Sequence, residues 1–118
     1  MGPTLRPVVW LGNSRKNMQE FPKPVRIDLG AALMAAQCGE TVEHVKPFKG
    51  VGSGVFEIVD RFNTDTYRLV YAVQLGRNIY VLHAFQKKSK SGTATPRPDV
   101  ELIQQRYKDA QEREQHGH

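Results

Sequence analysis

The chain has 118 residues, of which 39% are hydrophobic, and its 17 Lys and Arg against 12 Asp and Glu give a formal net charge of +5. A chain of this length buries one modest core. We therefore expect a single domain over residues 1–111, followed by a disordered tail over residues 112–118. The excess of positive charge favours polyanionic or acidic partners.

The sequence shows no sign of export or of a membrane span. No stretch approaches the roughly 18 apolar residues that a span requires, and the N-terminus lacks the apolar core of a signal peptide. The only cysteine, Cys38, lies in an alanine-rich setting without partners at metal-ligand spacing, so we expect a small buried residue with no chemical role. These observations predict a cytoplasmic protein with no membrane partner, no metal and no other cofactor.

The N-terminal part of the chain has the pattern of one strand and two helices. A short apolar run at residues 7–11 is typical of a strand closed by a turn. A helix over residues 15–21 then stops before Pro22, because the residue before a proline is pushed out of the helical region. Pro24 opens a second helix, whose apolar positions recur at helical spacing as far as Gly39. We expect the two helices to form a hairpin.

The middle of the chain changes from a broken, basic segment to strand-forming sequence. Residues 40–54 hold one proline and three glycines, so we expect an exposed, mobile connector there. Three runs rich in Val, Ile, Tyr and Phe follow, at residues 55–62, 66–75 and 79–86. The breaks between them are short, which favours hairpins over crossovers and predicts an antiparallel meander.

The C-terminal part predicts one more helix. Pro98-Asp99 opens it after a basic, polar segment, and its apolar residues Val100, Ile103, Tyr107 and Ala110 fall on one stripe. The order of one strand, two helices, antiparallel strands and a terminal helix indicates the α+β class.

Three strand motifs and a Thr-Pro pair follow one another in a specific order before this last helix. They are Val55-Phe56-Glu57-Ile58-Val59, Thr66-Tyr67-Arg68-Leu69-Val70-Tyr71, the run Ile79-Tyr80-Val81-Leu82-His83-Ala84-Phe85-Gln86-Lys87-Lys88, and Thr95-Pro96. In this combination the chain resembles the phage-derived, HigB-like branch of the RelE/ParE toxin superfamily. The resemblance implies a RelE-like fold, in which the N-terminal strand and the two-helix hairpin pack on a curved antiparallel sheet beside the C-terminal helix. It also implies the toxin of a type II toxin–antitoxin system. Such a toxin is a metal-independent endoribonuclease that cleaves mRNA on the ribosome and is neutralised by a cognate antitoxin, here expected to be a helix-turn-helix protein.

Cleaving RNA without a metal requires side chains that move protons and stabilise a phosphate. The 2′-hydroxyl must lose its proton, the extra negative charge must be neutralised, and the leaving oxygen must gain a proton. Arg68 can clamp the phosphate, with Lys87 and Lys88 adding positive charge. Glu57 or His83 can carry the proton. The resemblance supports only Arg68 and the basic end of the last strand directly, and which residue acts as base or acid stays open.

The catalytic candidates also have structural interpretations. Arg68 alternates with aromatic and aliphatic neighbours, so it lies on the opposite face of the sheet from them, where it is either functional or a solvent-exposed arginine. Glu57 and Arg61 share strand parity and can form a surface ion pair instead. His83 lies inside an apolar strand, where a hydrogen-bonded structural histidine is the commoner outcome.

A second group of residues is expected to bind RNA without taking part in the chemistry. It consists of Lys46, Lys49, Arg61, Phe85 and Lys90. The connector lysines form a basic lip that grips the RNA backbone without reading its sequence. Phe85 can stack on a base, although a core phenylalanine explains this residue equally well.

Other functions stay open at this point. Many relatives place a further arginine directly after the hydrophobic residue of the first motif, where this chain has Val59-Asp60-Arg61, so activity is either altered or lost. The main alternative is a non-catalytic, ParE-like toxin that binds DNA gyrase, which has no need of Arg68 and the Lys87–Lys88 cluster. A duplex-binding regulator has the least support, because the sequence shows no helix-turn-helix spacing and no zinc ligands.

Overall fold

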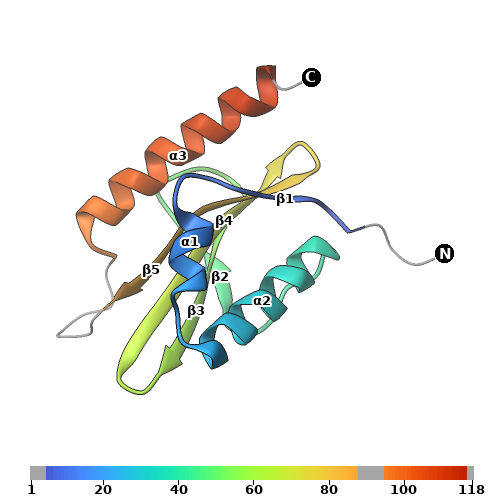
Figure 1. The fold of residues 1–118 in the computed structure, drawn as a ribbon. Coiled ribbons are helices and arrows are strands. Elements are labelled where there is room, and N and C mark those ends of the chain that lie inside the picture. The colour runs from blue at the N-terminus through green and yellow to red at the C-terminus, as the bar shows by residue number, and fades with distance from the viewer. Residues whose placement is uncertain (1–4, 88–94, 117–118) are drawn as a thin grey trace.

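The computed structural model describes residues 5–87 and 95–116 and shows helices on both sides of one sheet (Figure 1). Its elements in chain order are β1 (Val8–Trp10), α1 (Ser14–Gln19), α2 (Lys23–Gln37), β2 (Val45–Pro47), β3 (Val55–Phe62), β4 (Asp65–Leu75), β5 (Asn78–Lys87) and α3 (Arg97–His116). The α+β class is confirmed, and the bounds of β3, β4 and β5 agree with the predicted strands to within one residue. Among the described residues, no helix has the length and apolar character that crossing a membrane requires.

The five strands form one sheet in the order β1-β5-β4-β3-β2. The meander of β3, β4 and β5 is antiparallel, as predicted. β1, however, pairs parallel with β5, with Val8 opposite Ile79, so the sheet is mixed rather than antiparallel throughout. Local sequence patterns do not specify this pairing, because it joins residues about 70 positions apart through a crossover that includes both N-terminal helices.

The expected mobile connector over residues 40–54 contains regular structure. β2 lies at the edge of the sheet and pairs antiparallel with β3, with Val45 opposite Ile58, and Phe48 is buried. Most residues of this segment are exposed, as expected. The expectation that it holds no regular element was wrong, because a three-residue strand is too short to show alternation. Pro47 also argues against a strand unless that strand lies at an edge, as it does here.

Each face of the sheet carries its own hydrophobic core. Figure 1 shows α2 on one face and α3 on the other. On the α2 side, Leu29 and its helical neighbours pack against Leu69 and Tyr71 of β4. On the α3 side, Ile103 packs with Val70 and other strand residues. The predicted alternation is therefore confirmed over residues 67–73, where odd residues pack in the α2-side core and even apolar residues in the α3-side core. Beyond an irregularity in the register, Leu75 packs on the α3 side.

β1 covers only the first part of β5, and side chains cover the rest of this edge. Asn17 of α1 donates a hydrogen bond from Nδ2 to the Ala84 carbonyl at 3.0 Å. Arg106 of α3 donates one from Nη1 to the Leu82 carbonyl at 2.9 Å and another from Nη2 to Oδ1 of Asn13 at 2.7 Å. These side chains take the place that a further strand would occupy along an open edge.

Two expectations about helix ends were wrong. Residues 112–116 are not a disordered tail but the end of α3, because Ala110 is buried and Oε2 of Glu114 accepts a hydrogen bond of 2.7 Å from the Tyr80 hydroxyl. Burial, together with this bond, raises the pKa of Tyr80. Cys38 is exposed rather than buried, because it follows the last residue of α2, past the helix face that packs on the sheet.

Candidate functional site

Strand register brings most of the predicted functional residues onto the α3 face of the sheet, near the β3–β4 turn. Residues opposite one another on neighbouring strands share a face, and their side chains touch. Three successive rows across the strands are Lys46–Glu57–Val70–His83, Val59–Arg68–Phe85 and Arg61–Thr66–Lys87. Catalytic and RNA-binding candidates from four strands therefore lie side by side.

A buried ion pair lies in the middle of this group. Glu57 is 6% exposed and Arg68 is 5% exposed, and Nη1 of Arg68 lies 3.0 Å from Oε2 of Glu57. Nζ of Lys46 lies 3.7 Å from the other carboxylate oxygen, and the lysine side chain is 60% exposed. Two cations thus flank one carboxylate, and one of them borders solvent.

This geometry corrects two interpretations drawn from the sequence. Arg68 is not a solvent-exposed strand arginine, because only 5% of its surface is exposed. Glu57 pairs with Arg68 and Lys46 rather than with Arg61, which lies four positions further along the same strand, a span of about 13 Å. Removing two charges from water costs several kcal/mol per ion, so the Glu57–Arg68 pair is not explained by stability alone.

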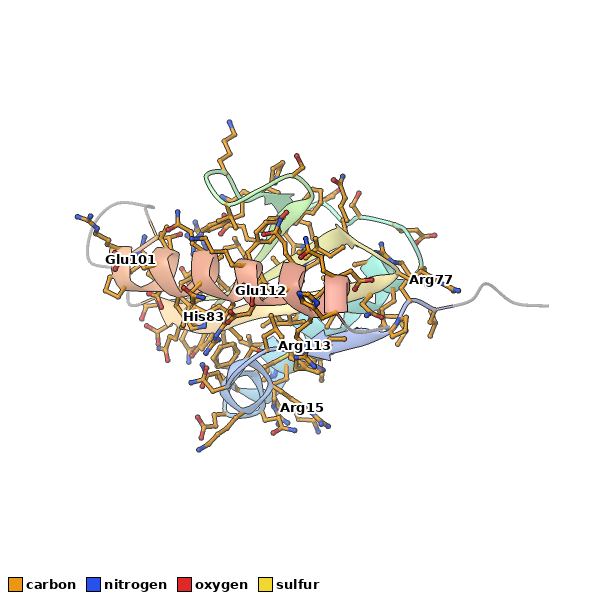
Figure 2. The ribbon with its side chains drawn as sticks, turned by 90° about the horizontal axis from the view of Figure 1, so that it is seen from above. Arg15, Arg77, His83, Glu101, Glu112 and Arg113 are labelled. Atoms are coloured by element: carbon orange, nitrogen blue, oxygen red, sulfur yellow. The ribbon has the colours of Figure 1, made fainter. Side chains whose placement is uncertain are left out.

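His83 forms the second polar contact of this face. Its Nε2 lies 2.8 Å from Oδ1 of Asp99, in the first turn of α3, and its ring stacks on Phe85 with centroids 4.7 Å apart. Figure 2 shows His83 beside the N-terminal half of α3. His83 is 5% exposed, and burial lowers its pKa, against the opposing effect of Asp99. These contacts support the structural interpretation, in which His83 joins α3 to β5.

Asp99 is the contact that the sequence did not predict. It stands 16 positions from His83 and meets it only when α3 packs on the sheet. The sequence held one indication of this contact, an acidic residue in the first turn of a helix. The favourable interaction of such a residue with the helix dipole explains it equally well.

The remaining candidates differ in how well the structure supports them. Lys87 is partly exposed and lies in the row next to Arg68, and Lys49 and Arg61 are exposed. Phe85 is 7% exposed, and its place in the α3-side core supports the core interpretation over base stacking. Lys88 and Lys90 lie outside the described residues. Within residues 5–87 and 95–116, no three His, Cys, Asp or Glu side chains lie close enough together to hold a metal ion.

Comparisons with known proteins give structural likenesses and a family. A chain of the toxin–antitoxin complex RelBE2 from Mycobacterium tuberculosis is similar to 70% of this chain and 99% of its own length, with a TM-score of 0.47 and 18% identity. No curated protein matches this sequence. The sequence profile described as "Phage derived protein Gp49-like" matches residues 16–108, which include α2, the sheet from β2 to β5 and the first half of α3. The chain therefore belongs to the Gp49-like family of phage-derived proteins.

Proposed function

We propose that this protein is the toxin of a type II toxin–antitoxin system and that it cleaves mRNA on the ribosome without a metal, as the HigB-like toxins that it resembles do. The observation that carries the proposal is the buried Glu57–Arg68 pair, with Lys46 in contact and Lys87 in the adjacent row. A surface that only binds a protein does not need a buried arginine and carboxylate, whose desolvation is costly.

The chemistry assigns a role to each member of this group. Arg68 and Lys87 neutralise the scissile phosphate, with the arginine able to form two parallel hydrogen bonds. Glu57 removes the proton from the 2′-hydroxyl, and the 2′-oxygen then attacks phosphorus as the bond to the 5′-oxygen breaks. A lysine ammonium gives its proton to that leaving oxygen, so that the products are a 2′,3′-cyclic phosphate and a 5′-hydroxyl.

Glu57 suits the role of base better than His83 does. Lys46, which contacts Glu57, is largely exposed, so this side of the carboxylate lies next to solvent from which RNA can approach. His83 is already engaged by Asp99 and stacked on Phe85. The proposal also includes a cognate antitoxin, expected to be a helix-turn-helix protein, and a place in the cytoplasm.

Induced expression tests the proposal. The wild type, Arg68→Ala and Lys46→Ala are expressed side by side, with growth followed and mRNA 5′ ends mapped. Lys23→Ala is the matched control, since this exposed lysine lies at the start of α2 on the other face of the sheet. We expect growth arrest with new, ribosome-phased cleavage sites in the wild type and in the control. Both signals should be lost in Arg68→Ala and weakened in Lys46→Ala. Arrest with intact mRNA would favour the gyrase-binding alternative instead.

A further inference from the structure

A groove outside the Glu57–Arg68 site runs along the other part of α3. It has a volume of about 520 Å³ and lies between the loop that joins β2 to β3 and the helix. Figure 2 shows this loop on one side of α3 and α1 on the other. Its lining residues are Gly50, Val51, Gly52, Gln104, Tyr107, Lys108 and Gln111. This volume falls within the range of roughly 300–1,000 Å³ that is typical of ligand sites.

Glycine forms much of the loop wall and keeps the groove open. Gly50 has a φ of +90°, a conformation that other residues rarely adopt, and a side chain there would meet only open space. At Gly52 an added Cβ would lie 2.6 Å from the Tyr107 ring, so the absence of a side chain lets the backbone approach the aromatic ring. Gln104 fixes the distance across the groove by donating a hydrogen bond of 3.2 Å to the Gly50 carbonyl.

The chemistry of the lining suits one nucleotide of an RNA strand. Two side-chain amides and a phenol offer donors and acceptors for a base edge, and the Tyr107 ring offers an apolar surface. Among the described residues of the lining, Lys108 is the charged one, and Lys49, next to Gly50 in the sequence, is exposed. Neither lysine forms an ion pair with another residue in the described part of the chain, so both are able to contact phosphate.

The walls of the groove belong to segments that adjoin, along the chain, elements of the site proposed above. The loop that forms one wall begins directly after β2, which carries Lys46, and ends at β3, which carries Glu57. The other wall is α3, whose first turn contacts His83. We propose that this groove holds a nucleotide that flanks the cleaved phosphate, with Gln104 and Gln111 on the base and Lys108 on the backbone. The inference rests on the proposed function and extends the site to residues that take no part in the chemistry.

Binding of a short, fluorescently labelled 2′-O-methyl oligoribonucleotide tests this inference. The 2′-O-methyl group prevents cleavage, so fluorescence anisotropy of the full chain reports affinity alone. Lys108→Ala is compared with Lys23→Ala, and Gln111→Glu with Gln115→Glu, which adds the same charge one turn further along α3 and outside the lining. All four positions are exposed, so none of these changes removes a core contact.

We expect the groove variants to lose affinity and the controls to keep it. Lys108→Ala should lower the slope of log Kd against log salt by about 0.7, the value for one phosphate contact on a single strand. Gln111→Glu should bind at least about tenfold more weakly than Gln115→Glu, because it replaces an amide that contacts the base with a negative charge inside the groove that holds the polyanionic strand. If the wild type binds and each groove variant behaves like its control, the groove inference is overturned while the proposed function stands. If the wild type does not bind the oligonucleotide, the groove inference also fails, and the expression experiment described above decides the proposed function separately.

Discussion

The buried ion pair yields the sharpest prediction. Removing one of its two charges should destabilise the fold much more than removing both. Among the described residues, replacing Arg68 by Met leaves buried Glu57 with Lys46, at 3.7 Å, as its remaining cationic partner. Breaking a buried pair typically costs about 3–5 kcal/mol, and the remaining lysine places this case near 3 kcal/mol. Replacing both residues, as Arg68→Met with Glu57→Leu, removes both charges and fills the space with apolar atoms, so its cost should be near zero.

Urea unfolding followed by circular dichroism measures this difference. With a slope of about 1–3 kcal/mol per M of urea, the single variant should unfold about 1–3 M earlier than the wild type. The double variant should unfold close to the wild-type midpoint and yet show no cleavage of RNA. A double variant as unstable as the single one would show that the pair itself stabilises the fold, and its burial would then need no functional explanation.

Three further predictions concern titration and the end of α3. Burial lowers the pKa of His83, so between that lowered value and 6.5 the unfolded chain binds more protons than the folded one. The free energy of unfolding should therefore fall as pH drops through this window. His83→Gln should flatten this part of a curve of stability against pH. Burial and the neighbouring Asp28 raise the pKa of Asp60, so its contribution to stability is present below pH 3.8 and is lost as pH rises through the raised value. Asp60→Asn should therefore raise the urea midpoint at pH 7. An unchanged midpoint would show that the ionised Asp60 carboxylate does not destabilise the fold. Tyr80→Phe removes the bond to Glu114, at a cost of about 1 kcal/mol, and should speed hydrogen exchange selectively in the last turns of α3.

Sequence patterns predicted the centre of the sheet well because local physics determines it. Runs of β-branched and aromatic residues, separated by short turns, identified three strands to within one residue. The period of two placed Arg68 on the face opposite Tyr67 and Tyr71, which is the observed arrangement. Short turns between the strands determine which residues are cross-strand neighbours. The clustering of Glu57, Arg68 and Lys87 therefore follows from local sequence patterns.

The contacts that the sequence did not predict all depend on packing between distant segments. The parallel pairing of β1, the edge strand β2 and the bond between Asp99 and His83 form only when elements far apart in the chain meet. The same holds for the end of α3, which was expected to be a disordered tail and where Glu114 accepts a hydrogen bond from Tyr80 of β5. Which arginine pairs with Glu57 likewise depends on the strand register, since Arg61 and Arg68 both lie on the same face of the sheet as Glu57.

β5 is held by segments near both ends of the sequence, and this has a consequence for when the Glu57–Arg68 site assembles. β1 pairs with its first part, and Arg106 joins its Leu82 carbonyl to Asn13, a contact between residues 93 positions apart. Contacts of such long separation close late, after the intervening chain is available. A chain still being synthesised, with α3 inside the ribosome, has an incomplete edge on β5 and lacks the helix that packs on this side of the sheet. We therefore expect the Glu57–Arg68 site to assemble only after α3 has left the ribosome and packed on the sheet.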